Sequence, residues 1–289
     1  MTKLMLSKIL ENEIVAALLN NRKGCVGLII VIFFIFMAVT ADIISPYNPW
    51  EIVGPPYSPP SSSHPLGLND IGQDILSELI HGSRVSLIVG FSVAFFGTLI
   101  GVTVGLISGY YGGIIDDVIT RGIDILLALP SLPLIILLAA YLGPSLFNII
   151  FVLSIMGWGG IARIVRAQTL SLRERAFVES CKAIGMSNFQ IIFKVILPNI
   201  FPIILAETVL RVTGAILSEA GLSFLGLGDP TKKSWGMMLY YANSRFAIFL
   251  GRWEWVFAPG FSIALLGTAF CLIGSALDEI ANPKIRRER

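Results

Sequence analysis

Three charged side chains interrupt an apolar segment, residues 200–222, and their spacing is the first feature of this sequence that bears on chemistry. Glu207 and Arg211 are four residues apart, so on a helix they share one face and can form an ion pair. Glu219 lies nearer the outer end of the segment, where it can reach water. Charges at membrane depth are costly, so they face a bundle interior, a water-filled path or a partner. A structural ion pair is the simpler explanation, and a substrate contact is the alternative.

No spacing in the sequence is typical of a metal site or of catalysis. The cysteines and histidines are scattered and lack ligand spacing: Cys25, Cys181, Cys271, His64 and His81. The sequence also lacks a Walker A glycine-lysine loop, an HExxH helix and a GxSxG elbow. We therefore expect a non-catalytic chain that holds no metal and no cofactor and does not itself hydrolyse ATP.

Residues 173–199 form a long polar segment between very apolar ones, and we predict two short helices separated by a tight break. Apolar residues recur at helical spacing in the first half: Phe177, Val178, Cys181 and Ile184. Gly185 supplies the break, because glycine adopts backbone angles that other residues avoid.

The second half of this segment carries signals for a helix start and a helix end. Ser187 is a suitable N-cap, and Gln190 three residues later completes a capping box. The apolar residues of this helix are predicted to share one face: Phe189, Ile192 and Phe193. Leu197 and Pro198 should end it, because proline cannot continue the hydrogen-bond ladder. A helical hairpin between membrane spans, with apolar side chains and mixed charge, is typical of a docking element for another protein.

The composition places this hairpin in a membrane protein. The 289 residues are 55% hydrophobic and only 14% charged, whereas soluble domains have about 25% charged residues. We predict an all-α membrane protein with about six transmembrane helices. The expected spans are residues 24–44, 85–115, 120–142, 146–166, 200–222 and 256–277.

The segments outside the spans are predicted as follows. Residues 1–23 form an interfacial helix before a retained anchor, with a cleaved signal peptide as the alternative. Residues 45–83 are a proline-rich extracytoplasmic loop with a short helix at 69–80. Residues 223–255 are a second external loop, and residues 284–289 are a basic tail.

Glycine and proline mark two of the expected spans. Glycines recur every four residues, which places a groove for close helix packing along one face: Gly97, Gly101, Gly105 and Gly109. Pro130 and Pro133 are expected to kink the span at 120–142. Such kinks fit either simple packing or a flexible gate in a translocation path, and the sequence leaves both open.

The distribution of positive charge predicts the orientation. Most of the 21 lysines and arginines lie in the N-terminal segment, in residues 163–194 and in the tail. By the positive-inside rule, both termini and the hairpin at 173–199 are cytoplasmic, in a multi-pass protein of the cell (inner or plasma) membrane. Six spans are consistent with this arrangement.

The hairpin also resembles the EAA loop of ABC importer permeases. That pattern is EAA, three residues, glycine, nine residues and I-x-L-P, and it falls on Glu179-Ser180-Cys181, Gly185 and Val195-Ile196-Leu197-Pro198. Ser180 and Cys181 replace two alanines. Elsewhere the chain resembles the dipeptide/oligopeptide/nickel branch, of DppC/OppC type, over residues 24–283. The segments that carry this likeness include His64-Pro65-Leu66-Gly67, Arg163-Ile164-Val165-Arg166-Ala167-Gln168 and Leu222-Ser223-Phe224-Leu225-Gly226-Leu227-Gly228. Lys232-Lys233 departs from the proline-rich run that is usual there.

The resemblance implies a type I ABC importer permease fold with a core domain at residues 84–283. The implied partners are a homologous second permease in a heterodimer, two cytoplasmic ABC ATPase subunits that bind ATP and magnesium, an extracytoplasmic substrate-binding protein and the lipid bilayer, with no nucleic acid. The implied coupling residues are Glu179, Ser180, Cys181, Ala183, Ile184, Gly185, Met186, Ser187, Phe189, Gln190, Leu197 and Pro198. The translocation path is assigned to Glu207, Arg211, Glu219, Pro130 and Pro133.

Three kinds of function follow from these features. The favoured one is a permease subunit of a binding-protein-dependent ABC importer, with di- or oligopeptides as the leading substrate and nickel or oligosaccharides as alternatives. A channel or secondary transporter that works without ATPases is disfavoured, because ion-coupling carboxylates are absent midway through several spans. A membrane receptor or scaffold that uses the hairpin to recruit a soluble partner is the third.

Overall fold

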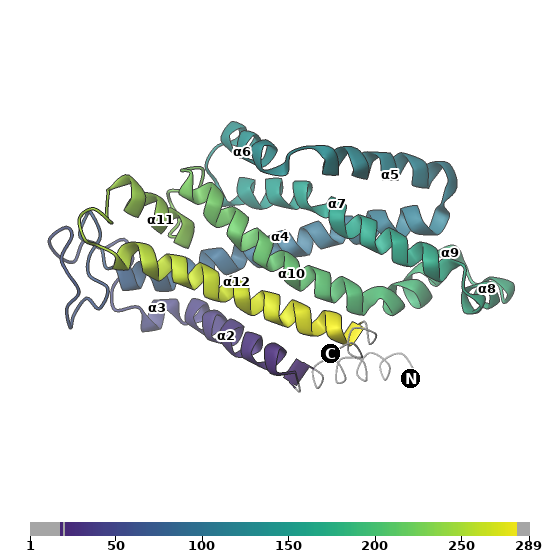
Figure 1. The fold of residues 1–289 in the computed structure, drawn as a ribbon, viewed down its shortest axis with the longest axis horizontal. Coiled ribbons are helices and arrows are strands. Elements are labelled where there is room, and N and C mark those ends of the chain that lie inside the picture. Colours follow the sequence, from purple (N-terminus) through teal and green to yellow (C-terminus); the bar gives the residue numbers. More distant parts are fainter. Residues whose placement is uncertain (1–17, 20, 282–289) are drawn as a thin grey trace.

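The computed structural model describes residues 18–19 and 21–281 and forms a bundle of helices, with no β-strand in those ranges (Figure 1). The prediction of an all-α protein is confirmed. Most of the interfacial helix expected at 1–23, and the whole tail at 284–289, lie outside the described residues. The helices are α2 (Arg22–Val39), α3 (Ala41–Ile44), α4 (Ile75–Tyr111), α5 (Gly113–Ala128), α6 (Ser131–Leu142), α7 (Leu146–Arg173), α8 (Ala176–Ala183), α9 (Asn188–Ile191), the π-helical η1 (Ile192–Ile196), α10 (Leu197–Phe224), α11 (Trp235–Ser244) and α12 (Glu254–Ala281).

The number of membrane spans agrees with the sequence, but one span has an unexpected form. Five helical stretches of the described chain are long and apolar enough to cross a membrane, and α5 with α6 makes a sixth if that bent pair is one span. The pair bends by 86° at Leu129 and Pro130. The expected kink in a span at 120–142 is therefore a complete break. Leu129 takes an extended conformation because the proline ring disfavours a helical residue before it.

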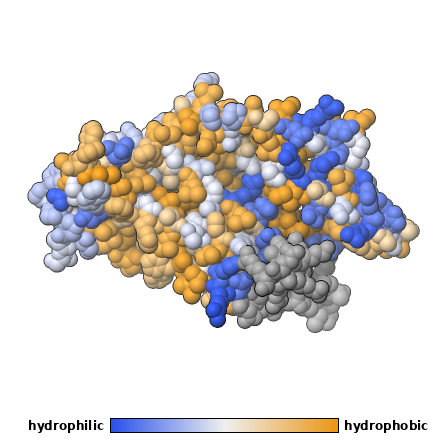
Figure 2. All heavy atoms as spheres, viewed as in Figure 1, coloured by the Kyte–Doolittle hydropathy of each residue, from blue (hydrophilic) through white to orange (hydrophobic). Residues whose placement is uncertain are grey.

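The polar parts of the molecule gather at its two ends. In Figure 1 the helices α8 and α9 project at one end, which we call the hairpin end, whereas α3, α11 and the 45–74 loop lie at the other, the loop end. Figure 2 shows apolar side chains over much of the middle of this view and hydrophilic ones mainly toward the ends. This is the pattern expected when lipid surrounds the middle of a helical bundle.

The long helix α4 packs closely against α7 along its glycines. A methyl group added at Gly101 would lie 2.1 Å from the Ile161 side chain and 2.8 Å from the Trp158 carbonyl oxygen. At Gly105 and Gly109 it would meet α7 backbone oxygens at 2.7 Å. The fourth glycine, Gly97, has more room. Glycine here allows the backbones of α4 and α7 to approach one another, as in other membrane helix pairs.

Replacing Gly101 with valine is expected to destabilise the protein, because the larger side chain cannot fit without separating α4 from α7. Overpacking of this kind costs about 1–3 kcal/mol. The melting temperature of the detergent-purified protein should fall. The matched control is Gly122→Val in α5, which introduces the same side chain into a helix where an added methyl meets nothing within 4 Å. Equal melting temperatures for the two variants would contradict the packing argument.

The expectation that Leu197 and Pro198 end a helix is wrong. The chain passes through the π-helical segment η1 directly into α10, so that residues 188–224 form one continuous helical stretch. The Leu197 amide donates to the carbonyl of Ile192, five residues back, rather than to the usual partner four residues back. Pro198 follows directly, at a point where the hydrogen-bond pattern has already changed from the α-helical one. The proline therefore follows a π-helical turn instead of stopping the helix.

The loop end is more ordered than the sequence suggested. The helix expected at 69–80 begins only at Ile75, and Asp74 caps it by accepting a hydrogen bond from the Ser77 amide at 2.8 Å. The external loop expected at 223–255 contains α11. The two regions are joined by an ion pair between Lys233 and Glu78, whose side chains are 10% and 4% exposed.

Candidate functional site

The elbow of the hairpin is built around Gly185. Helix α8 ends in a Schellman motif: the Gly185 amide donates to the Lys182 carbonyl at 3.0 Å, and the Met186 amide to the Cys181 carbonyl at 3.1 Å. Gly185 has φ +82°, the left-handed region that glycine adopts without strain. Nothing approaches within 4 Å of the place where a Cβ would lie, so backbone conformation and not crowding selects glycine here.

The capping box predicted for the second helix is confirmed. The Gln190 amide donates to Ser187 Oγ at 3.3 Å, and the Ser187 amide donates to Gln190 Oε1 at 3.2 Å. The two ends of the elbow are thus fixed by local hydrogen bonds on both sides of Gly185. The shape of the hairpin is therefore defined by hydrogen bonds between residues close in the chain.

The inner side of the hairpin is packed into the bundle. Val178, Ile191 and Ile196 have no exposed surface, and they form one apolar cluster with residues of α4, α7 and α10. Cys181 and Met186 pack against the edge of this cluster. A movement of the hairpin must therefore displace the helices on which it rests.

The outer side of the hairpin presents apolar side chains to the surroundings. Ile184 is 77% exposed and Phe189 is 68% exposed, and the Phe189 and Phe193 rings lie 4.5 Å apart. The single apolar face expected for the second helix is therefore wrong: Ile192 points inward, whereas Phe189 and Phe193 are exposed. In the first helix, Val178 points inward and Phe177 is exposed. Large apolar side chains exposed at a polar end of the molecule are typical of a protein-binding surface.

The other coupling residues assigned from the sequence lie around this surface. Ser180 Oγ donates to the Ala176 carbonyl at 2.9 Å. The remainder divide by burial: Glu179, Ala183, Ser187 and Pro198 are exposed, and Gln190 and Leu197 are half-buried. The structure thus places the assigned set on one compact hairpin and the adjoining first turn of α10.

The three charges of α10 do not form one site. Arg211 donates a hydrogen bond to the Gly157 carbonyl of α7, and its predicted ion pair with Glu207 is not among those of the described residues. The backbone oxygen lies closer than the carboxylate because the glycines of α7 leave room for the guanidinium. The expectation that Glu219 reaches water is also wrong. It is 1% exposed and accepts a hydrogen bond from Ser223 at 2.7 Å, beneath the start of α11.

The proline candidates for a gate lie away from these charges in the sequence and have exposed side chains. Pro130 directly precedes α6 at the bend, and Pro133 follows in the first turn of that helix. The bend itself gives α5 and α6 different directions.

Two ion pairs join α5 to α7. Asp116 accepts two hydrogen bonds from Arg166, at 2.5 and 2.6 Å, and Asp124 accepts one from Arg163 at 2.6 Å. Sequence reasoning missed both ion pairs, because the partners are far apart in the chain.

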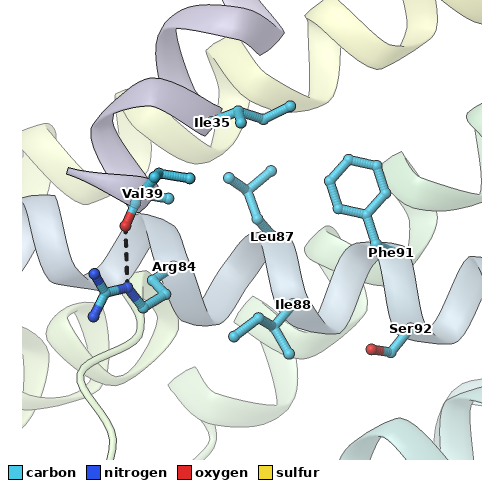
Figure 3. Close-up of a pocket in the computed structure, with 8 residues that line it drawn as sticks. Ile35, Val39, Arg84, Leu87, Ile88, Phe91 and Ser92 are labelled. Carbon is cyan, nitrogen blue, oxygen red and sulfur yellow. Dashed lines mark hydrogen bonds between the residues drawn. The ribbon is translucent and has the colours of Figure 1, made fainter. Parts of the chain in front are cut away.

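An apolar groove lies between α2 and α4, and Arg84 lies at the end of the groove nearest the loop end of the molecule (Figure 3). Arg84 Nε donates to the Ala38 carbonyl at 3.0 Å, and its NH2 group lies 3.0 Å from Asp42. The hydrogen bond from Arg84 holds the pKa of the Asp42 carboxyl below its ordinary value. The groove holds no carboxylate or histidine along its walls, which are otherwise Ile35, Val39, Leu87, Ile88, Phe91, Ala38 and Ser92. Within the described residues no group of three potential metal ligands occurs.

Comparison with known proteins identifies relatives over nearly the whole chain. Residues 101–287 match the family model described as "Binding-protein-dependent transport system inner membrane component". Residues 12–60 match the "N-terminal TM domain of oligopeptide transport permease C". The "Dipeptide transport system permease protein DppC" of Bacillus subtilis is 39% identical over 93% of this chain and 84% of its own length. The protein of the same name from Alkalihalophilus pseudofirmus is 41% identical over 92% and 88%. The "Oligopeptide transport system permease protein OppC" of Bacillus subtilis is 38% identical over 93% and 88%.

Proposed function

The chain belongs to the family of binding-protein-dependent transport system inner membrane components, and we propose that it is a permease subunit of an ATP-driven importer of di- or oligopeptides. The observation that carries the proposal is the hairpin at residues 173–199. It combines a fixed elbow, a buried inner side and an exposed apolar outer side. A membrane subunit without a nucleotide-binding motif needs such a surface to receive work from an ATPase.

The proposed mechanism joins this surface to the bundle. Two ATPases bind ATP and magnesium and receive one hairpin from each of two homologous permeases. Closure of the ATPases moves the hairpins, and because Val178 and Ile191 are packed into the bundle, the helices follow. The permeases thereby alternate between inward-open and outward-open states, and an external binding protein delivers the substrate at the loop end.

The orientation belongs to the same proposal. We place the hairpin and both termini on the cytoplasmic side, because the lysines and arginines concentrate there. Arg22 begins α2, and Lys23 pairs with Glu279 near the end of α12 at 2.9 Å, so the start of the first span and the end of the last lie together. The loop end then faces the binding protein.

The residues of α10 and the bent pair are proposed to border the path. Glu207 and Arg211 are partly exposed midway along α10, and Pro130 lies at the bend between α5 and α6. Ionisable groups inside a membrane segment are retained where they meet water, solute or another charge. Glu219 is not assigned to the path, because it is 1% exposed and its carboxylate accepts a hydrogen bond from Ser223 of the same helix.

The decisive experiment reconstitutes the chain with its second permease and ATPases in liposomes. Binding proteins loaded with a dipeptide, an oligopeptide, nickel or an oligosaccharide are added separately, and ATP hydrolysis and uptake are measured. We expect peptide-loaded binding protein to stimulate both. Stimulation only by the nickel or sugar protein would overturn the substrate class. Uptake without any ATPase subunit would overturn the importer itself and favour a channel or secondary transporter.

A further inference from the structure

Tyr110, near the end of α4, contacts three other elements of the hairpin end. Its hydroxyl donates a hydrogen bond to Asn188 Oδ1 at 2.8 Å, at the first residue of α9. Its backbone carbonyl accepts a hydrogen bond from Arg173, at the end of α7, at 3.1 Å. The Lys182 ammonium of α8 lies 6.0 Å from the centre of its ring. One side chain and its backbone therefore contact α7, α8 and α9 together.

The environment of this tyrosine combines burial with a directed polar contact. Tyr110 is only 6% exposed, and its ring belongs to the apolar cluster that contains Val178 and Ile191 of the hairpin. An apolar ring would fill the same space, so packing alone does not require the hydroxyl. The hydroxyl adds a bond of fixed direction to α9, in addition to the apolar contacts, which have no preferred direction. The neighbouring Tyr111 is 50% exposed, and the structure gives its hydroxyl no hydrogen bond to the described residues.

The helix that carries Tyr110 extends through the whole bundle. Helix α4 runs without interruption for 37 residues, which is about 55 Å at 1.5 Å per residue, and its other end is capped by Asp74 at the loop end. Close packing of its glycines on α7 keeps the two helices together. A displacement applied at Tyr110 is therefore passed along a continuous helix toward the side where substrate is delivered.

We propose that Tyr110 is a positioning residue that transmits movement of the hairpin into α4 through its hydrogen bond to Asn188. The proposal rests on the importer function above and adds the route by which the hairpin acts on the bundle. The hydrogen bond from Arg173 holds the end of α4 to α7. Through the hydrogen bond between Asn188 and Tyr110, a movement of α9 displaces the end of α4. Without the hydroxyl, the hairpin still docks on the ATPase, but part of its movement no longer reaches α4.

The test removes only the hydroxyl, in the complete importer reconstituted in liposomes. With Tyr110→Phe, the peptide imported per ATP hydrolysed should fall about fivefold, the effect of losing one hydrogen bond of about 1 kcal/mol. The amount of assembled complex and the basal ATP hydrolysis should match the unaltered importer. Asn188→Ala should have the same effect, and the double variant should be no worse than either single one. The matched control Tyr111→Phe should leave the ratio unchanged.

Three outcomes would overturn the proposal: an unchanged ratio in both single variants, effects that add in the double variant, or an equal loss with Tyr111→Phe. If Tyr110→Phe assembles poorly, Asn188→Ala decides alone, because Asn188 is exposed and lies outside the core. Gly185→Val, measured in the same preparation, separates this proposal from the importer function. If it uncouples import and Tyr110→Phe does not, only the route through Tyr110 is wrong. If import and hydrolysis stay coupled in Gly185→Val as well, the role of the hairpin itself is wrong.

Discussion

Valine at position 185 is expected to reduce peptide import at least tenfold while the chain still inserts into the membrane. Gly185 has φ +82°, where a β-branched residue is strained by about 1–3 kcal/mol. Relief of that strain breaks the Schellman hydrogen bonds from Gly185 and Met186 and changes the angle between α8 and α9. The exposed Ile184 and Phe189 then no longer present one surface to the ATPase, so ATP hydrolysis and import become uncoupled.

The control for this variant places valine at another glycine with positive φ, outside the hairpin. Gly143, between α6 and α7, has φ +86° and an equally open surrounding, so Gly143→Val should lower stability without uncoupling. Gly185→Asn should retain more import than Gly185→Val, because asparagine tolerates the left-handed region better. Import, ATP hydrolysis and co-purification with the ATPases are measured for all three variants. Unaltered import in Gly185→Val would count heavily against the coupling role of the hairpin.

The features that were predicted well from the sequence depend on neighbours in the chain. The capping box needs only Ser187 and Gln190, three residues apart, and the elbow needs only a glycine after an amphipathic stretch. The membrane spans follow from long, predominantly apolar runs. Such signals are local, so no knowledge of the tertiary structure is needed to interpret them.

The features that were missed or wrong depend on contacts between distant segments. The spacing of Glu207 and Arg211 predicts an ion pair on an isolated helix, but α7 offers Arg211 a backbone oxygen instead. Glu219 is buried where α11 packs against α10, a contact that spacing along one helix does not indicate. Tyr110 and Asn188 are 78 residues apart, and neither belongs to a motif. A single sequence carries no signal for partners of this kind.

Replacing Lys233 with methionine is expected to destabilise the loop end strongly. The Lys233 ammonium contacts Glu78 Oε1 and lies 2.7 Å from Gln73 Oε1 and 4.1 Å from the centre of the Trp50 ring. It therefore joins the 226–234 segment to the 45–74 loop and to the first turn of α4. Methionine fills a similar volume but leaves the Glu78 carboxylate buried without its cation. Removing one partner of a buried ion pair costs about 3–5 kcal/mol.

A second substitution separates lost charge from lost packing. The double variant Lys233→Met, Glu78→Gln leaves neither charge of this ion pair buried. The amide oxygen at position 78 can still accept the hydrogen bond that Asn69 donates to Glu78 at 3.1 Å. The double variant should therefore recover most of the melting temperature that the single one loses in detergent. Lys232→Met is the matched control, because that neighbouring lysine is exposed, and it should melt like the unaltered protein. If the double variant is no more stable than Lys233→Met, the ion pair with Glu78 is not what stabilises the loop end, and the contacts of Lys233 with Trp50 and Gln73 have that role. The proposed binding protein docks at the loop end. Loss of the contact between Lys233 and Glu78 should therefore also weaken the stimulation of ATP hydrolysis by the loaded binding protein.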